Sequence, residues 1–254
     1  MPAEIIFNSG DIPHYTFPPF SQPGLFHGVF TRHGGVSCGP WSTLNVSYDV
    51  GDITEKVDSN RKKIKDFFDV SRLVSLRQVH GDQVFVFKKE ISADLVFDGY
   101  DAIITNVSDV ALMIQQADCQ AVFLYDPRQT VIGLIHSGWR GSVLDIIGKT
   151  IRRMTEEFSV TPSDVIAGIS PSLGPCCADF INHQKELPGE FQEFHVGSNK
   201  FDFWAASKDQ LQSAGIRPAN IHIAGLCTVC SSNFFSYRRQ AKTGRFASII
   251  GMKP

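Results

Sequence analysis

The sequence predicts an α/β protein of the α+β type, with mixed β-sheets and helices on the outside. Composition is the first observation: 43% of the 254 residues are hydrophobic and 20% are charged, as in a globular chain with a large core. The second is that strand-like and helix-like segments mix without the strict βαβ alternation of a parallel sheet. The third is that no linker, repeat or low-complexity segment divides the chain. We therefore expect a single domain over residues 1–254.

Three segments have helical patterning. Apolar residues three or four positions apart predict an amphipathic helix in each of the first two. Asp52 or Thr54 is expected to cap the first helix, and Ser142 the second. Gly215 is expected to end the third. The predicted helices span residues 52–70, 142–158 and 201–215.

Strand patterns fill much of the remaining chain. Residues 121–126 and 130–136 are almost continuously apolar, which is typical of strands buried on both faces. Gly81-Asp82 marks a turn inside the segment 74–87. The loop at 30–45, "FTRHGGVSCGPWSTLN", is rich in Gly and small polar residues, so its backbone could approach a ligand closely. The other predicted strands span residues 101–106, 110–115, 165–170 and 220–227.

Charge and segment patterns argue against several classes of protein. A formal net charge of −2 gives no general attraction to nucleic acid or to an anionic membrane. No stretch approaches the roughly 18 apolar residues of a membrane span, and no basic-then-apolar signal segment is visible. We therefore expect a cytoplasmic protein, a monomer or small homo-oligomer, with its six cysteines reduced.

Three short segments interrupt strand patterns with a reactive side chain. "RQVHGD" places His80 after a strand, "QADCQ" places Cys119 between two strands, and "LIHSGWRG" places His136 at the end of a buried strand. Taken alone, a His or Cys beside an apolar run is more often part of the core. If the strands are neighbours in one sheet, however, the three side chains could converge. Two imidazoles and one thiolate are a plausible zinc set that leaves a fourth position open.

The other cysteines give weaker signals. Cys227 and Cys230 have CxxC spacing, but no second CxxC completes a four-cysteine zinc site, and no helix start follows as in thioredoxin-like proteins. We interpret them as structural. Cys176 and Cys177 lie in a Pro/Gly-bounded turn, where they could line a pocket.

Several arginines near these segments could hold an anion, because the planar guanidinium binds phosphate well. A surface salt bridge is the alternative for each, and it is at least as good an explanation for Arg238 and Arg239. No GxxxxGK[ST] or GxGxxG motif predicts a nucleotide site. The candidates are Arg77, Arg140, Arg238, Arg239 and Arg245.

Taken together, these segments resemble one family along nearly the whole chain. The matching motifs, in order, are "HGVFTRHGGVSCGPWSTLN", "VGD", "NR", "RQVHG", "ADCQAVFLYDP", "IGLIHSGWRG", "GISPSLGPCC" and "FFSYRR" followed by "TGRFAS". They are similar to those of the YfiH-like family, also called the laccase-domain or polyphenol oxidase family and regarded as purine nucleoside phosphorylases.

The resemblance implies a fold, a metal and an activity. It implies packed mixed sheets with flanking helices, and a catalytic zinc bound by His80, Cys119 and His136. It also implies phosphorolysis of adenosine, inosine, guanosine and S-methyl-5′-thioadenosine, together with adenosine deamination. The partners would be purine nucleosides and phosphate. Further candidates for substrate contact are Asn45, Arg61, Arg77 and Arg140.

Three other functions stay open at this stage. A copper-dependent polyphenol oxidase would suit the older family name, but a laccase needs paired histidine clusters and this chain has eight histidines with no His-x-His pair. A metal-free hydrolase could use Cys119 with His80 or His136, since a thiolate beside an imidazole is a competent nucleophile. A non-enzymatic binding module is the third.

Overall fold

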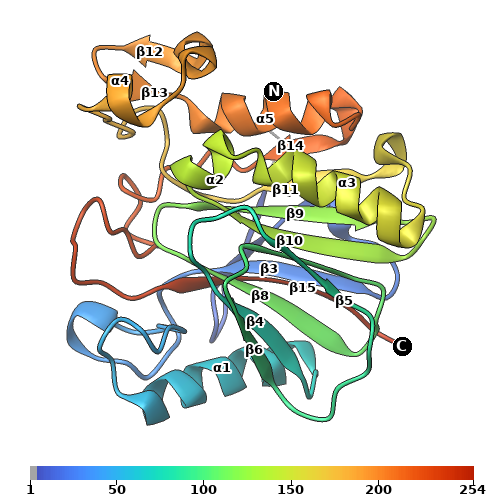
Figure 1. Cartoon of the computed structure of the whole chain (residues 1–254). Helices are drawn as coiled ribbons and strands as arrows, with labels where there is room; N and C mark the ends of the chain where they lie inside the picture. Colours follow the sequence, from blue (N-terminus) through green and yellow to red (C-terminus); the bar gives the residue numbers. More distant parts are fainter. Residues whose placement is uncertain (1–4) are drawn as a thin grey trace.

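Two β-sheets stacked face to face form the centre of the protein, with helices on both outer faces. The computed structural model describes residues 5–254. Figure 1 shows α1 (Thr54–Phe68) below the sheets, and α3 (Ile146–Phe158) and α5 (Phe203–Ser213) above them. The predicted α+β fold with mixed sheets and flanking helices is therefore confirmed.

The seven-stranded sheet packs its outer face on α1. Its order is β1-β2-β3-β15-β8-β4-β6, and β4 is parallel to both of its neighbours while the other pairs are antiparallel. The strands are β1 (Ile6–Asn8), β2 (His14–Thr16), β3 (Leu25–Phe30), β15 (Phe246–Met252), β8 (Val110–Gln116), β4 (Leu73–Arg77) and β6 (Leu95–Asp98).

The six-stranded sheet packs its outer face on α3 and α5. Its order is β14-β11-β9-β10-β7-β5, with parallel pairs at each edge and antiparallel pairs between them. The strands are β14 (Ile221–Ile223), β11 (Ile166–Ile169), β9 (Gln120–Asp126), β10 (Val131–Ser137), β7 (Ala102–Thr105) and β5 (Val84–Phe87).

The remaining elements are short. A two-stranded ribbon, β12 (His195–Gly197) and β13 (Lys200–Phe201), lies with α4 (His183–Glu186) at one end of the molecule, and α2 (Trp139–Val143) precedes α3 (Figure 1). Single 3₁₀ segments occur at Pro18–Phe20, Gly39–Trp41, Pro162–Asp164, Gly189–Phe194 and Pro218–Asn220.

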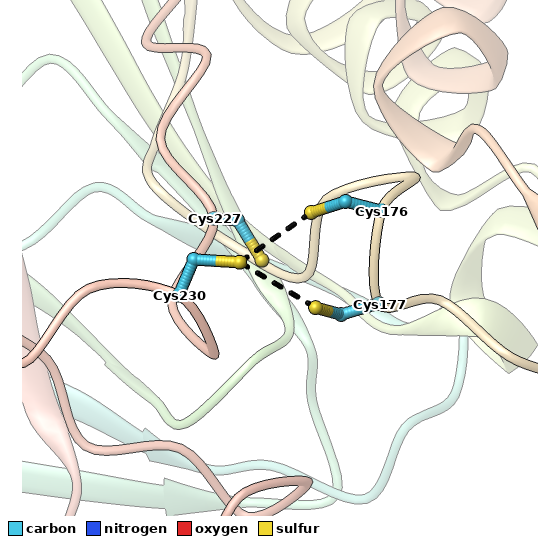
Figure 2. A group of neighbouring side chains, drawn as sticks. All are labelled: Cys176, Cys177, Cys227 and Cys230. Carbon is cyan, nitrogen blue, oxygen red and sulfur yellow. Dashed lines mark hydrogen bonds between the residues drawn. The ribbon is translucent and has the colours of Figure 1, made fainter.

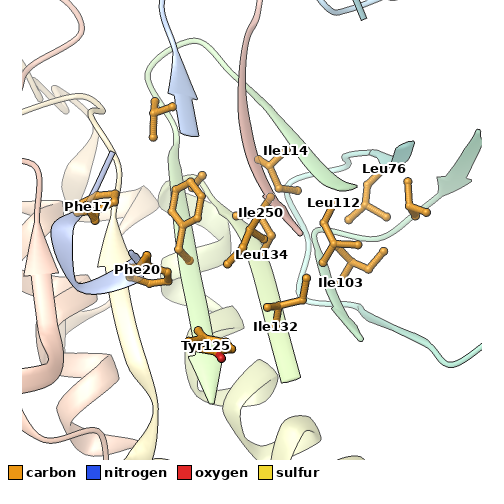
Figure 3. Close-up of a cluster of buried hydrophobic side chains, with 14 of the residues drawn as sticks. Phe17, Phe20, Leu76, Ile103, Leu112, Ile114, Tyr125, Ile132, Leu134 and Ile250 are labelled. Carbon is orange, nitrogen blue, oxygen red and sulfur yellow. The ribbon is translucent and has the colours of Figure 1, made fainter. Parts of the chain in front are cut away.

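Alternation along the central strands produces this layering. In β8, Leu112 and Ile114 point into the space between the sheets, whereas Ala111 and Met113 face the α1 layer. Side chains from both sheets fill the central core, which Figure 3 shows in close-up. Each fully buried aliphatic side chain of this kind contributes about 1.5–3 kcal/mol. The prediction that β9 and β10 are buried on both faces is confirmed.

Local details differ from the sequence predictions. The segment 142–158 is two helices, because Asp145 adopts a left-handed conformation (φ 55°) and its carboxylate caps α3 by accepting from the Gly148 N–H. Ser142 is therefore inside α2 and is not a cap. Neither Asp52 nor Thr54 caps α1, since Ile53 occupies the N-cap position.

Several strands were not predicted, and one prediction was too long. The strands β1, β2, β3, β6 and β15 all lie in the seven-stranded sheet. The strand expected over residues 220–227 ends at Ile223. Gly81-Asp82 does not close a hairpin: β4 and β5 belong to different sheets, so the chain crosses between the layers at this point.

Candidate metal centre

His80, Cys119 and His136 converge where the chain passes between the two sheets. His80 lies on the crossover from β4 to β5, Cys119 on the crossover from β8 to β9, and His136 near the end of β10. One ligand atom from each residue lies within 4.8 Å of those of the other two. Convergence was expected if the strands were neighbours in one sheet, but they belong to two: β4 and β8 are neighbours in the seven-stranded sheet, and β9 and β10 are neighbours in the six-stranded sheet. Convergence arises because both crossovers occur at the same end of the stack.

The backbone at both crossovers is strained. His80 (φ 60°) and Asp118 (φ 92°) adopt left-handed conformations without being glycine, which costs on the order of 1–3 kcal/mol each. Such strain is kept where the surrounding structure fixes it. Here it turns the imidazole of His80 and the thiol of Cys119 toward each other.

Asp101 fixes the first of these turns. Its side chain is fully buried, and its carboxylate accepts backbone N–H bonds from His80 (2.9 Å) and Gly81 (2.7 Å). The same carboxylate lies 2.8 Å from Nδ1 of His136, so Nδ1 carries a proton toward Asp101, and the other ring nitrogen, Nε2, is left for Cys119, where a bound metal ion would take the place of its proton. A carboxylate that orients a ligand histidine in this way is a common feature of metal sites. Nothing in the sequence marks Asp101 as part of the site, since it is an ordinary polar residue at the start of the segment "DAIITN".

Charge in the cluster is arranged as a thiolate beside an imidazolium. Burial alone would raise the pKa of the Cys119 thiol, but His136 and His80 outweigh it and bring the pKa to about 6. Burial alone would lower the pKa of His136, yet Cys119 and Asp101 raise it to about 9. Hydrogen bonds from His136 and the 80–81 backbone likewise hold the pKa of Asp101 below its usual value, against the effect of burial. The thiolate is therefore available as a ligand at neutral pH.

Gly138 gives the cluster its space. A Cβ at this position would lie 3.0 Å from the Cys119 sulfur and 3.2 Å from a ring carbon of His80. Any larger residue at position 138 would therefore displace the side chains of Cys119 and His80. This explains the glycine that follows His136 and Ser137 before α2 begins.

A cavity of about 910 Å³ opens above the three ligands. The aromatic side chains on its wall are Trp139, Phe180, Phe203 and Tyr237, and the basic ones are Arg77, Arg238 and Arg245. Of the described residues that line it, two are histidines, His80 and His136. A multi-copper centre needs more imidazoles than this wall supplies.

The three basic side chains on the wall differ in their freedom. Arg77 forms ion pairs with Asp49 and Asp98. Arg238 donates from Nη1 to a backbone carbonyl and stacks over Phe180. Arg245 is partly buried and donates from Nη1 to the carbonyls of Thr243 and Gly244. Within residues 5–254, neither Arg238 nor Arg245 forms an ion pair.

The Arg245 guanidinium lies close enough to Cys119 for their charges to interact. Burial lowers the pKa of its guanidinium, whereas the nearby charges of Cys119 and Asp118 raise it. A cation beside the thiolate, without a carboxylate partner, is well placed to meet an anionic ligand in the cavity.

The other candidates for substrate contact do not line the cavity. The Asn45 side chain is buried and accepts from the Arg245 backbone N–H, so it fixes the position of the Arg245 backbone. Arg61 is buried against the Val46 carbonyl and the Tyr48 ring. Arg140 is exposed and stacks on Trp139. Contact between substrate and any of these three residues stays a prediction.

The structure also decides two expectations from the sequence, on Asp118 and on the loop 30–45. From its place before Cys119, Asp118 could orient a ligand histidine or simply be a turn residue. Its carboxylate accepts from the Thr228 hydroxyl and the Arg238 N–H and from no histidine among the described residues, so the first alternative is wrong. The loop 30–45 does not line the cavity, whereas Ser47, Asp49 and Val50 beyond it do. The Asn60 side chain fixes that loop through bonds to Val36, Ser37 and Thr43.

Comparison with known proteins identifies the group to which the chain belongs. A family model described as multi-copper polyphenol oxidoreductase laccase matches residues 26–253. The chain belongs to this family. The laccase-domain relatives include purine nucleoside phosphorylase YlmD of Geobacillus stearothermophilus, which is 31% identical over 93% of this chain and 92% of the relative. A purine nucleoside phosphorylase of Bacteroides thetaiotaomicron is 30% identical over 91% of this chain and 92% of its own.

Solved structures of the laccase-domain family have the same fold. The crystal structure of YlmD from Geobacillus stearothermophilus superposes with a TM-score of 0.87 at 28% identity, covering 99% of this chain and 100% of that one. The YfiH protein of Bacillus licheniformis superposes with a TM-score of 0.86 at 26% identity, covering 97% and 99%. Within residues 5–254, no helix is both long and apolar enough to cross a membrane.

Proposed function

We propose that this protein is a zinc-dependent purine nucleoside phosphorylase acting on adenosine, inosine, guanosine and S-methyl-5′-thioadenosine. One observation carries the proposal: three side chains of metal-binding type meet on the floor of a cavity whose wall carries arginine and aromatic residues. The names of the relatives from Geobacillus stearothermophilus and Bacteroides thetaiotaomicron, both purine nucleoside phosphorylases, support the same reaction.

The donor set of His80, Cys119 and His136 fits zinc. Two imidazoles and a thiolate match its borderline softness, and three protein ligands leave one position for substrate or water. When bound, the ion supplies Lewis acidity and lowers the pKa of a coordinated water toward ~7. Asp101 holds His136 in the tautomer that such a site needs.

Phosphate would bind on the wall that carries Arg245. Arg77 is paired with carboxylates, whereas the Arg245 guanidinium lies beside Cys119 and Asp118 and donates from Nη1 to the carbonyls of the adjacent residues Thr243 and Gly244. Bidentate hydrogen bonds from a guanidinium would orient a phosphate oxygen toward the anomeric carbon of the sugar. In the reaction a C–O bond forms, the glycosidic C–N bond breaks, and the departing purine takes up a proton.

The purine ring would lie among the aromatic residues of the cavity wall. Phe180 and Trp139 pack edge to face, with ring centroids 6.4 Å apart, and both line the cavity. Flat apolar surfaces of this kind stack with a heterocycle without selecting its exocyclic groups. That property suits an enzyme that accepts adenine and hypoxanthine nucleosides alike.

Adenosine deamination is proposed as a second reaction of the same site. A histidine/cysteine zinc site with a bound water is the arrangement that nucleobase deaminases use to attack the carbon bearing the amino group. The open position beside His80, Cys119 and His136 supports this reaction, in which water replaces ammonia on the purine.

Product analysis tests the proposal. Zinc-loaded protein is incubated with adenosine, with and without phosphate, and the products are separated by chromatography. We expect adenine and ribose 1-phosphate only when phosphate is present, and inosine in both reactions. Zinc-loaded protein that forms none of these products would show the proposal to be wrong.

A further inference from the structure

A second cluster of metal-binding side chains lies outside the cavity floor. Its members are four cysteines whose sulfur atoms all lie within 4.8 Å of one another: Cys176, Cys177, Cys227 and Cys230. Figure 2 shows the four side chains pointing into one common space from two different turns. All four are free thiols.

The topology of the six-stranded sheet brings these turns together. Strands β11 and β14 are parallel neighbours, so their carboxyl ends lie side by side and the segments that follow them leave the same end of the sheet. The segment after β11 carries Cys176 and Cys177, and the segment after β14 carries Cys227 and Cys230. Beyond the strands the segments stay paired through a parallel bridge between Ser172 and Cys227.

The sulfur positions have the spacing of a single tetrahedral ion. Zn–S bonds of about 2.3 Å place the sulfurs of a tetrahedral site roughly 3.8 Å apart. The Cys230 sulfur lies 3.6 Å from that of Cys176 and 3.5 Å from that of Cys177. A disulfide requires about 2.05 Å. In an iron–sulfur cluster the cysteines bind different iron ions and need a wider arrangement.

The backbone around the sulfurs is already organised. The Gly174 N–H points at the Cys227 sulfur at 3.4 Å, which is a favourable contact for a thiolate. A Cβ at Gly174 would lie 3.0 Å from the Cys227 Cβ. The two turns can therefore pack this closely because residue 174 is glycine.

Two cations reinforce the turns. Nη1 of Arg239 donates to the carbonyls of Thr228, Val229 and Ser231, which fixes the CxxC turn from outside. The Lys200 ammonium donates to the Cys176 carbonyl at 2.8 Å. Four thiolates around a divalent ion carry a net charge of −2, and nearby cations lower the cost of holding it.

We propose that Cys176, Cys177, Cys227 and Cys230 bind a structural zinc ion. The CxxC pair is completed by two adjacent cysteines and needs no second CxxC. With four protein ligands the site is closed, so it has no open position for substrate. Its role is to hold the cavity wall, because Asp179 and Phe180 follow one turn and Tyr237 and Arg238 follow the other.

Metal counting in matched variants tests the inference. Zinc per chain is measured by elemental analysis in the full-length protein, in a His136→Ala variant and in a Cys230→Ser variant, after dialysis against a weak chelator. We expect the count to fall from two to one in each variant. X-ray absorption of His136→Ala should show four sulfur ligands at the zinc that remains.

Other outcomes would overturn the inference. One zinc in the unmodified protein that is lost in His136→Ala and kept in Cys230→Ser would show that the cysteine cluster binds none. Fewer than six thiols in the chelated, unfolded protein under argon would show a disulfide in place of a metal site. If Cys230→Ser does not fold, titration of the chelated natural protein with zinc gives the same answer, since a single equivalent bound would contradict a second site. None of these results depends on nucleoside turnover.

Discussion

The two clusters of potential metal ligands differ in chemistry and in what surrounds them. At the cavity floor, the two histidines stabilise the negative charge of the single thiolate and lower the pKa of Cys119 to about 6. In the cysteine cluster, burial and neighbouring sulfurs raise the pKa of Cys177 to about 11 and that of Cys176 further still, whereas hydrogen bonds from the backbone and from Cys176 outweigh burial and lower the pKa of Cys227. In the first cluster, the histidines themselves stabilise the thiolate. In the second, a bound cation is needed to stabilise four thiolates close together.

The two clusters also differ in the number of ligands and in access, as the proposed reactive and structural roles require. The histidine/cysteine cluster has three ligands and faces a cavity of about 910 Å³. The cysteine cluster has four ligands from two turns of the wall. Three ligands leave a position for chemistry, and four leave none.

The largest effect is expected on removing a ligand of the first cluster. His136→Ala should reduce phosphate-dependent adenine release by about 10³-fold or more, because the Lewis acidity of the metal is worth several kcal/mol. Release is followed by chromatography on protein whose fold is checked by circular dichroism. His222→Ala, at a partly exposed histidine outside the cavity lining, is the matched control and should keep its activity. An active His136→Ala enzyme would break the distinction between the two clusters.

Removing a ligand of the second cluster should act on stability instead. Cys230→Ser is expected to lower the free energy of unfolding by on the order of 3 kcal/mol, since loss of a metal site is among the few large single-residue effects. Denaturant unfolding in the presence of zinc measures this loss. Cys38→Ser is the control: Cys38 is an exposed cysteine outside both clusters and should change stability by less than about 0.5 kcal/mol. Equal stability of the two variants would contradict a structural role.

The carboxylate behind the first cluster should have an intermediate effect. Asp101→Asn keeps the size of the side chain but removes the charge that orients His136, so we expect a loss of about 10–100-fold in zinc affinity or turnover. Competition with a chromophoric chelator gives the affinity. Asp66→Asn, on the exposed face of α1, should leave the affinity unchanged. Zinc affinity that is the same in Asp101→Asn and the natural protein would show that Asp101 only fixes the loop.

The smallest effect is expected on the phosphate site. Arg245→Met should raise the KM for phosphate by about 10-fold, because a hydrogen bond to a charged group is worth about 1.5–3 kcal/mol. Steady-state kinetics with varied phosphate and saturating nucleoside measures it. Arg128→Met, which removes a surface ion pair with Asp164, is the control. An unchanged KM for phosphate would move the anion site to Arg77 or Arg238.

Sequence patterns predicted the layers better than the details of the site. Continuous apolar runs identified β9 and β10 as buried on both faces, since only a strand between two packed layers has that composition. The long central strand β15 was not predicted, although its segment "FASIIGM" is apolar. The split between α2 and α3 was also missed, because it depends on the backbone conformation of Asp145.

Only part of the candidate site could be predicted from the sequence. His80, Cys119 and His136 were predicted, and the structure brings their side chains together. Asp101 was not, because its importance comes from contacts with residues 20 to 35 positions away. The cysteine cluster was hidden for a similar reason: its two halves are 50 residues apart and meet only through the parallel pairing of β11 and β14.

An anomalous difference map from zinc-loaded crystals tests the central claim most directly. The account predicts two zinc peaks per chain: one among His80, Cys119 and His136 with a fourth position open to the cavity, and one surrounded by four cysteine sulfurs. A map without a peak between His80, Cys119 and His136 would contradict the claim that this cluster is a metal centre.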